Sequence, residues 1–307
     1  MSRTQVSGIL TMGGTTNVHS SAVGDHPVVN VGTAPRAQDA PAGVDVGIIT
    51  ILDVETDAVR LALDLREDPI DSLRFYTGEV PAARKPVTVA AIRALDQGQR
   101  SAILAYDNLC AHHDPTVVVL AGIGGGLHKD VRKGDVVVAT RVVYYDLRKE
   151  TPDGTQRRGE ERHAPAGVGH AVNAFFTDHH PGEFSVKDPG GTARTVRFHH
   201  GPIASGDAVV ADRDSGIVRF LAGFNDKILA VDMEAAGVGQ ACHERSASTA
   251  RPHGWVVVRG ISDDANPAKN DDHHGIASWH AAVALKKLIP YLVRTVRDRH
   301  AGRGVRA

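Results

Sequence analysis

Charged side chains follow two apolar, strand-like segments in the C-terminal part of the 307-residue chain. Residues 228–231 lead into Asp232-Met233-Glu234, and residues 255–258 lead into Arg259-Gly260-Ile261-Ser262-Asp263. In α/β proteins, ligands bind beyond the carboxyl ends of strands, because polar groups are exposed there without opening the core. A single carboxylate in such a place is more often a helix cap or a solvated charge. The combination of the two segments predicts two walls of one site.

A third carboxylate, Glu55, follows the first strand-like segment of the globular region. Residues 44–52 form a continuous apolar run, which is typical of a strand buried on both faces. Apolar side chains then recur at helical spacing over residues 56–65, so Glu55 lies at a strand-to-helix junction. A glutamate in the first helical turn also interacts favourably with the helix dipole. This structural role and a functional role are compatible.

Four of the five residues from 122 to 126 are glycine, and they follow the apolar segment 116–120. Glycine lets backbone N–H groups approach a ligand closely, because it carries no side chain. The segment has no Gly-Lys-Ser/Thr ending, so it is not a P-loop, and Leu127 stands where a dinucleotide fingerprint needs its third glycine. A tight turn explains one or two glycines. Four favour a ligand-binding glycine loop.

The rest of the globular region predicts an α/β domain in which strands and helices alternate. Apolar periodicity predicts helices over residues 97–112, 168–180, 214–224, 235–242 and 275–292. Strands are predicted twice within residues 70–95, and once each over residues 136–146 and 194–204. No internal repeat is apparent in the sequence.

Residues 147–170 form a polar segment that we predict to be mostly loop. It carries Arg157, Arg158 and Arg162 beside several acidic residues. Most segments of this kind are solvated surface. The alternative is a flap over the site whose arginines supply cations to a substrate phosphate.

Composition narrows the function classes further. With 35 Lys+Arg against 36 Asp+Glu, no global basic field points to nucleic acid or to an acidic membrane surface. The two cysteines lie far apart in the sequence, which fits a reducing compartment, and no apolar run approaches the ~20 residues that span a bilayer. Adjacent histidine pairs are poor chelators, so we expect no metal site. The sequence therefore predicts a cytoplasmic protein.

Three regions are expected along the chain. Residues 1–44 are rich in Gly, Ser, Thr, Ala and Pro and carry few large apolar side chains, which predicts a disordered N-terminal arm. A short strand pair or an oligomerisation arm is the alternative. Residues 45–293 make up the catalytic domain, and residues 294–307 form a basic C-terminal tail.

Five motifs, in this order, resemble those of the nucleoside phosphorylase superfamily. They are Gly47-Ile48-Ile49 followed by Glu55, the glycine loop followed by Gly134-Asp135-Val136-Val137-Val138, Ile203-Ala204-Ser205-Gly206-Asp207, Val231-Asp232-Met233-Glu234-Ala235-Ala236, and Val258-Arg259-Gly260-Ile261-Ser262-Asp263. The resemblance runs from about residue 45 to residue 293 and is closest to the 5′-methylthioadenosine/S-adenosylhomocysteine nucleosidase branch.

The resemblance implies a three-layer α/β/α fold around a twisted mixed β-sheet, and a homo-oligomer, a dimer or higher. It implies that Glu55 activates the attacking water and that Asp263 protonates N7 of the leaving purine. The implied ribose-binding group is Met233, Glu234 and Arg259. The implied base-binding group is Val209, Val210 and Ser262, and the glycine loop consists of Gly122, Ile123, Gly124 and Gly125. The ligand is a small purine nucleoside, or a 5′-phosphorylated purine nucleotide whose 5′ group would contact Arg157, Arg158 and Arg162, and no cofactor is implied.

The division of roles agrees with the chemistry of the N-glycosidic bond. Cleavage builds positive charge on the sugar and negative charge on the departing base, so one carboxyl group protonates the base while another activates water. Two positions depart from the nucleosidases: Ile123 replaces a hydroxyl residue, and Val209 replaces an aromatic that stacks on the base. Phe220, Tyr144 or Tyr145 would then supply the stacking ring.

We therefore predict a purine nucleoside N-ribohydrolase with an adenosine-type substrate. No Gly-Asp-Pro phosphate loop follows the first strand, which favours water over phosphate as the nucleophile. A phosphate-dependent phosphorylase of the same fold is one alternative. The other is a nucleotide-sensing module of a bacterial signalling or conflict system, but such a module does not need a water-activating carboxylate.

Overall fold

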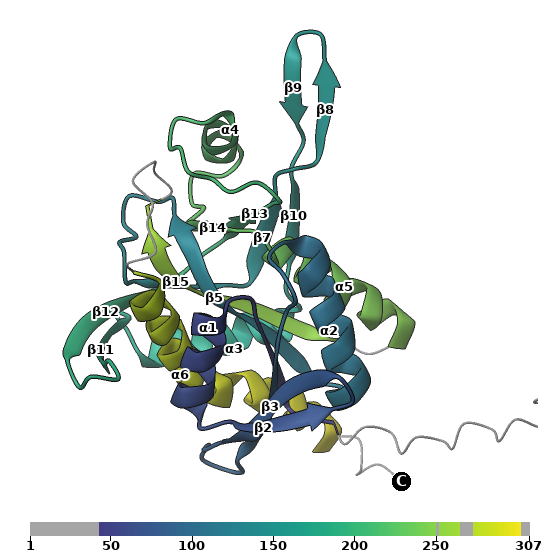
Figure 1. Ribbon diagram of the computed structural model, residues 1–307, viewed down its shortest axis with the longest axis vertical. Helices are drawn as coiled ribbons and strands as arrows, with labels where there is room; N and C mark the ends of the chain where they lie inside the picture. Colours follow the sequence, from purple (N-terminus) through teal and green to yellow (C-terminus); the bar gives the residue numbers. More distant parts are fainter. Residues whose placement is uncertain (1–42, 250–251, 265–272, 302–307) are drawn as a thin grey trace, which may run out of the picture. The chain divides into compact units, whose positions relative to one another are not determined.

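The computed structural model describes residues 43–249, 252–264 and 273–301 (Figure 1). The predicted N-terminal arm therefore lies almost wholly outside the described residues, as does the end of the basic tail. The helices are α1 (Asp53–Leu63), α2 (Gln99–His113), α3 (Ala166–Asp178), α4 (Gly216–Phe224), α5 (Ala235–Thr249) and α6 (His274–Ala301).

Most strands belong to one mixed sheet. Its main path follows the order β10-β7-β13-β14-β5-β1-β4-β3-β2, and β15 joins it beside β5. The strands are β1 (Val46–Thr50), β2 (Arg66–Ile70), β3 (Leu73–Val80), β4 (Val87–Arg93), β5 (Val117–Gly126), β6 (Val136–Ala139), β7 (Arg141–Tyr144), β8 (Arg148–Thr151), β9 (Gly154–Arg157), β10 (Glu160–His163), β11 (Glu183–Lys187), β12 (Ala193–His200), β13 (Ile203–Ser205), β14 (Ala230–Asp232) and β15 (Gly254–Asp263).

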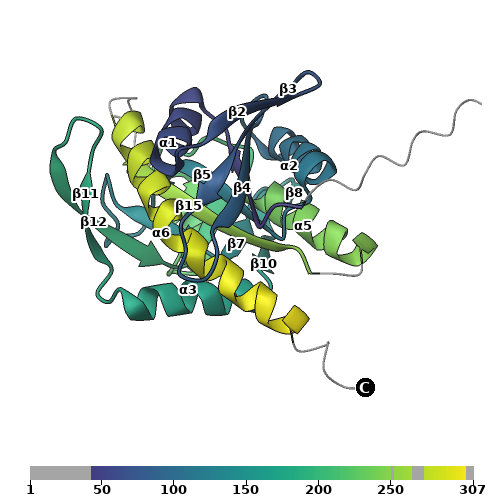
Figure 2. The same cartoon turned by 90° about the horizontal axis from the view of Figure 1, so that it is seen from below.

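Helices cover both faces of this sheet, as two separate apolar clusters show. Along β5, side chains at 117, 119 and 121 join one cluster, and those at 118 and 120 join the other, because successive strand residues point to opposite faces. The first cluster includes α1, α3 and α6, and the second includes α2 and α5 (Figure 2). Three layers result. The predicted α/β/α fold with a mixed sheet is confirmed.

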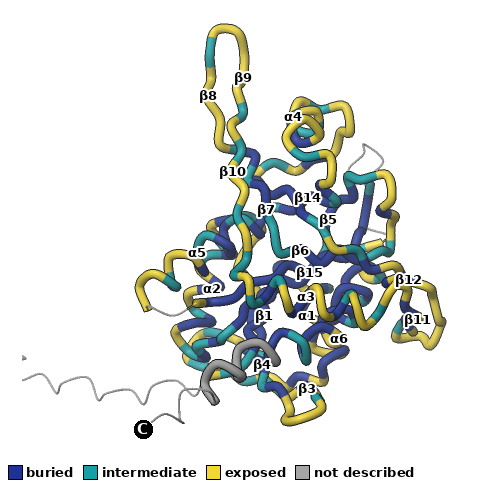
Figure 3. The backbone as a smooth tube through the Cα atoms, turned by 180° about the vertical axis from the view of Figure 1, so that it is seen from behind, coloured by how far each residue is buried: buried dark blue, intermediate teal, exposed yellow. Residues whose placement is uncertain are grey.

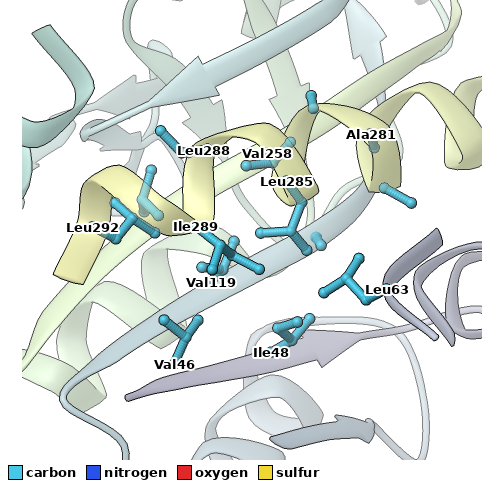
Figure 4. Packing of buried hydrophobic residues seen from close by; sticks show 14 of the residues in the cluster. Val46, Ile48, Leu63, Val119, Val258, Ala281, Leu285, Leu288, Ile289 and Leu292 are labelled. Carbon is cyan, nitrogen blue, oxygen red and sulfur yellow. The ribbon is translucent and has the colours of Figure 1, made fainter. Parts of the chain in front are cut away.

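The long helix α6 crosses one face of the sheet and buries a row of apolar side chains there. Leu285, Leu288 and Ile289 are fully buried against Val119 of β5 and Val258 of β15 (Figure 4). Fully burying each of these side chains is worth about 1.5–3 kcal/mol relative to exposure. This packing fixes the two central strands that carry the site. Residues 294–301, predicted as a separate basic tail, continue the backbone of this helix.

Two strands extend further than the sequence predicted. The glycines at 122–126 form the second half of β5, where β15 pairs with the strand on one side and β14 pairs with its last two residues. Strand β15 likewise continues to Asp263, so Arg259 lies inside a strand. Both predicted ends were wrong, because neighbouring strands supply backbone hydrogen-bond partners that a single segment does not reveal.

The segment 147–170 is more regular than predicted. Strands β8 and β9 form a hairpin around the turn Pro152-Asp153, and Gly154, the first residue of β9, has φ +115° (Figure 1). Pro, Asp and Gly are common in tight turns, and glycine adopts a positive φ without steric cost. Most of the hairpin is exposed (Figure 3). The prediction of a loop was therefore wrong for residues 148–163.

The two strands predicted within residues 70–95 are confirmed as β3 and β4, whereas β2, which precedes them, was not predicted. One strand prediction needed correction. Residues 193–205 form β12 and β13, which pair with different neighbours on either side of Pro202. Proline has no N–H for a ladder hydrogen bond, so it separates the two strands.

Candidate active site

A cavity of about 270 Å³ opens where β1, β5, β14 and β15 end. It is lined by side chains from several separate segments: Ile51, Leu52, Glu55, Gln97, Ile123, Gly124, Gly125, Ala208, Val209, Val210, Val231, Asp232, Met233, Glu234, Arg259, Ser262, Asp263 and His274. The structure thus brings the three candidate carboxylates, Glu55, Glu234 and Asp263, to one place. The two walls inferred from the sequence are walls of the same cavity.

Within the described part of the chain, the side chain of Glu55 is held by backbone N–H groups alone. It is 2% exposed and lies in the first turn of α1. Its Oε2 accepts from the N–H groups of Ile51 at 2.7 Å and Leu52 at 2.9 Å, and its Oε1 accepts from the N–H of Ile123 at 2.8 Å. A carboxylate offers about four acceptor positions, two on each oxygen. The three bonds therefore fix the group and leave one position on Oε1.

Gly122 permits this close approach of Glu55 to the central strand. A Cβ at position 122 would lie 2.4 Å from Oε1 of Glu55 and 2.5 Å from Nη1 of Arg259. Any side chain at this position would push the two charged groups apart. The glycine that the sequence placed in a ligand loop therefore has a packing role, between two side chains of the site.

Arg259 is 1% exposed and joins two carboxylates. Its Nε and Nη2 donate to Oδ2 of Asp232 at 2.9 and 2.6 Å, and Nη2 also donates to Oε2 of Glu234 at 2.9 Å. Burial lowers the pKa of Arg259, but the charges of Asp232, Glu234 and Glu55 outweigh burial and raise it. The guanidinium is therefore a fixed positive charge.

Glu234 combines burial with several charged neighbours. Its Oε1 accepts from the N–H of Gly98 at 3.0 Å, opposite the oxygen that Arg259 holds. Burial raises the pKa of Glu234; Arg259 lowers it, Asp232 raises it, the Gly98 N–H lowers it and Glu55 raises it, with a net rise. Each oxygen keeps a further acceptor position, so the carboxylate can accept from two hydroxyl groups at once.

Asp263 ends β15 and is 1% exposed. Its Oδ2 accepts from the hydroxyl of Ser262 at 3.0 Å, and that hydroxyl lies 3.4 Å from the carbonyl oxygen of Gly124. Register between β15 and β5 shifts between Ile261 and Asp263, which marks a bulge. Bulges re-aim side chains next to active sites. In a regular strand, Ile261 and Asp263 would point to the same side, because they are two residues apart. Here Ile261 lies in the core and Asp263 lines the cavity.

Residues 208–210 form the wall that the sequence assigned to the base. Val209 is 57% exposed, whereas Val210 is buried. The hydroxyl of Tyr145 donates to the carbonyl oxygen of Ala208 at 2.8 Å, and Asp146 Oδ2 accepts from the N–H of Asp207. Tyr145 is fully buried, so it anchors this loop and does not stack on a ligand. No Phe, Tyr or Trp of the described residues lines the cavity.

The arginines of the 147–170 segment do not line this cavity. Arg157 donates to the carbonyl oxygen of Tyr145 and to Asp146, and Arg162 pairs with Glu160. Arg158 is exposed. The β8–β9 hairpin itself projects away from the sheet (Figure 1). Within one chain, the predicted contacts of Arg157, Arg158 and Arg162 to a 5′ group therefore have no structural support.

Three polar side chains of the cavity lining had no role assigned from the sequence. Asp232 was quoted only as part of a motif, yet it holds Arg259 and, through Oδ1, the N–H groups of Glu234 and Ala235. Gln97 and His274 line the cavity from two other segments. The signal for Asp232 was available, because an aspartate before a helix is a frequent cap. Among the described residues, no cluster of three metal-ligating side chains occurs.

The fold and the site define a class of protein. The family model of the phosphorylase superfamily matches residues 46–297, so this chain belongs to that superfamily. The resemblance read from the five motifs is confirmed.

Individual relatives are nucleosidases. The chain is 31% identical over 227 residues to a 5′-methylthioadenosine/S-adenosylhomocysteine nucleosidase of Exiguobacterium sp., covering 73% of this chain and 87% of the relative. It is 25% identical over 260 residues to the ATP nucleosidase Cap17 of Escherichia coli, covering 77% of this chain and 49% of the relative. The chain therefore spans about half the length of Cap17.

Solved structures share the fold. The futalosine hydrolase of Helicobacter pylori has a TM-score of 0.62 at 19% identity, covering 80% of this chain and 97% of its own. The 5′-methylthioadenosine/S-adenosylhomocysteine nucleosidase of Neisseria meningitidis has a TM-score of 0.61 at 20% identity, covering 80% of this chain and 98% of its own.

Proposed function

We propose that this protein is a purine nucleoside N-ribohydrolase that cleaves the N-glycosidic bond of an adenosine-type substrate with water. The observation that carries the proposal is the meeting of Glu55, Glu234 and Asp263 in one cavity. Each carboxylate has a different set of partners, so each can do a different task. The names of the related nucleosidases support the same reaction class.

Glu55 takes the role of general base. Its backbone donors hold the carboxylate still, and the remaining acceptor position on Oε1 binds the attacking water. The water oxygen bonds to C1′ of the ribose while the C1′–N9 bond breaks, and the proton of the water passes to Glu55. General base assistance of this kind contributes about 10²–10⁴-fold to the rate.

Asp263 takes the role of general acid. It delivers a proton to N7 of the purine, so the electron pair of the broken bond leaves on a neutral base. Ser262 holds Oδ2 of this carboxyl group, and the base lies against Val209 and Val210. The products are the free sugar and the free purine.

Glu234 accepts hydrogen bonds from the 2′- and 3′-hydroxyls of the ribose, and Met233 packs against the sugar. Arg259 supports this carboxylate from behind, since it is buried and bonded to Glu234 and Asp232. A substrate that lacks a hydroxyl leaves a buried acceptor without a partner, which costs about 1–3 kcal/mol. The site therefore favours ribonucleosides.

Water is favoured over phosphate by the charges that line the cavity. Among the described residues, Arg259 is the only Lys or Arg in the lining, and its Nε and Nη2 already donate to Asp232 and Glu234. A bound phosphate would need donors of its own. This arrangement supports hydrolysis.

The proposal includes a homo-oligomer, a dimer or higher, in the cytoplasm. Two buried free cysteines, Cys110 and Cys242, fit a reducing compartment. In the described part of the chain, no helix is both long and apolar enough to cross a membrane. Light scattering after size-exclusion chromatography measures the oligomeric state, and a monomer at all concentrations would contradict this part of the proposal.

The deciding experiment is chromatography of purine release from methylthioadenosine, adenosylhomocysteine, adenosine, inosine, AMP and ATP, each with and without phosphate. Release without phosphate is the expected result. Release from the thioethers assigns the protein to thioether cleavage, and release from AMP or ATP assigns it to nucleotides. Strict dependence on phosphate would establish a phosphorylase instead, and no release from any substrate would overturn the enzymatic proposal.

A further inference from the structure

The N-terminus of α5 is capped by side chains from three segments of the chain. The N–H groups of Glu234 and Ala235 donate to Oδ1 of Asp232, that of Ala236 donates to the Ser205 hydroxyl at 3.1 Å, and that of Gly237 donates to Oε1 of Gln99 at 2.5 Å. The first helical bond runs from Val238 N–H to the Glu234 carbonyl. All four N–H groups that a helix start leaves without helical partners are therefore satisfied.

Gln99 contributes both ends of its amide to this cap. While Oε1 accepts from Gly237, Nε2 donates to the Ser205 hydroxyl at 2.9 Å. Gln99 is 8% exposed and Ser205 is fully buried. A Cβ at position 237 would lie 2.8 Å from the carbonyl oxygen of Gln99 and 3.0 Å from its Oε1. The two helix starts, of α2 and α5, are thus in direct contact at this point.

The residue before Gln99, Gly98, donates to Glu234, the carboxylate that we assign to the ribose hydroxyls. Gly98 has φ +99°, in the left-handed region that favours glycine, and its N–H donates to Oε1 of Glu234 at 3.0 Å. Fixing the Gln99 side chain therefore fixes the direction of this N–H. The same amide also fixes the helix turn that begins at Glu234.

We infer that Gln99 is a positioning residue that sets the orientation of Glu234 for the ribose hydroxyls. It acts through Glu234 and does not line the reaction cavity. This inference rests on the proposed function, since it assigns Glu234 to the sugar. A misplacement of a binding group by about 1 Å can cost roughly 10²-fold in rate.

Two variants separate positioning from simple stabilisation. Gln99→Met keeps the length of the side chain but removes its donor and its acceptor. Its kcat/KM falls about 10–100-fold for the ribonucleoside that the wild-type protein cleaves fastest, and much less for the 2′-deoxy analogue. The ratio of kcat/KM for the ribonucleoside to kcat/KM for the 2′-deoxy analogue therefore falls toward one.

Gln99→Glu keeps the shape and lets the Ser205 hydroxyl donate to the new carboxylate. It adds a negative charge beside Glu234, which already has Asp232 and Glu55 as like charges and Arg259 and the Gly98 N–H as favourable partners. A like charge disfavours the ionised form. The acid limb of the kcat/KM profile therefore moves to higher pH.

Arg100→Gln is the matched control, because Arg100 is the exposed next residue of α2. It should leave the ratio and the pH profile unchanged. If Gln99→Met lowers the melting temperature but keeps the wild-type preference for the ribonucleoside, the role of Gln99 is structural only and the inference is overturned. Purine release by the wild-type protein is measured in the same assay, so failure of the proposed function shows separately.

Discussion

Glu55 and Glu234 line the same cavity but are held in different ways. Among the residues that the structure describes, Glu55 is bound by three backbone N–H groups and by no charged side chain. Glu234 belongs to a buried charged cluster with Arg259 and Asp232. Both carboxylates are nearly inaccessible, at 2% and 5% exposure. Burial alone therefore does not distinguish them.

The difference matches the two tasks. A general base must change its charge during the reaction, and neutral donors allow that without breaking an ion pair. A binding carboxylate must keep its charge and its place, and a fixed guanidinium provides both. The contrast predicts that changes at Glu55 mainly affect turnover, whereas changes around Glu234 affect turnover and folding together.

The largest expected effect on rate is that of Glu55→Gln. Turnover should fall about 10²–10⁴-fold, because an amide cannot take the proton of the water. The new NH₂ group must also face at least one backbone donor, which costs about 1–3 kcal/mol of stability. Single-turnover kinetics and thermal unfolding measure the two effects. Asp53→Asn, an exposed change in the same helical turn, is the control. Unchanged turnover would remove Glu55 from the mechanism.

Asp263→Asn should show an effect that depends on the leaving group. Purine release falls about 10²–10⁴-fold, because N7 no longer receives a proton. A riboside with 4-nitrophenolate as its leaving group needs no such proton, so its cleavage should stay close to the wild-type rate. Equal losses on both substrates would contradict the general-acid role. Asp264→Asn is the neighbouring control.

Arg259→Met should mainly destabilise the fold. It leaves Asp232 and Glu234 buried without their counter-charge, which costs about 3–5 kcal/mol of the free energy of unfolding. Urea unfolding measures this loss. Arg197→Met breaks an exposed pair with Glu183 and should cost much less, because solvent screens an exposed pair. A small loss at position 259 would show that the cluster contributes little to the fold.

Gly122→Ala should disturb Glu55 and Arg259 together, because both side chains pack against this glycine. The added methyl group displaces Glu55, Arg259 or both, and overpacking of this kind costs about 1–3 kcal/mol. Both stability and kcat/KM should fall. In Gly169→Ala, the added Cβ meets nothing within 4 Å, and helix propensity predicts a gain of up to about 1 kcal/mol. Full activity of the Gly122 variant would contradict the close packing.

The smallest predicted effect is on the pH dependence of substrate capture. Only ionised Glu234 can accept from both ribose hydroxyls, and burial raises its pKa above the ordinary value of a glutamate. As pH falls, kcat/KM should therefore decline at a higher pH than an ordinary carboxyl would cause. The pH profile of kcat/KM with a ribonucleoside measures this limb. A profile that stays flat down to the ordinary pKa of about 4.3 would contradict the raised value.

The sequence predicted where the chemistry lies better than how it is held. Glu55, Glu234 and Asp263 follow strand-like segments, and strand ends in an α/β sheet gather at one edge, so their meeting could be foreseen. Arg259 was also expected beyond its strand, but it lies inside β15. Its position inside β15 depends on pairing with β5 and β6.

Contacts between residues far apart in the sequence were the main feature that the sequence analysis did not predict. Gln99 touches Ser205 and Gly237, which are more than 100 residues away, and nothing in the local sequence indicates that contact. The β8–β9 hairpin is a different case, because Asp153-Gly154 gave a local turn signal. The many charged residues before and after this turn did not indicate the two short strands that they form.

The capped start of α5 has a consequence for the kinds of anion that this site accepts. A helix N-terminus is a ready-made phosphate site when its N–H groups are open. Here Asp232, Ser205 and Gln99 already occupy them, and the carboxylate of Glu234 stands at the positive end of the helix. Conversion of the proposed hydrolase into a phosphorolytic enzyme would therefore require a new anion-binding site elsewhere in the cavity, together with cations beyond Arg259 that the described lining does not carry.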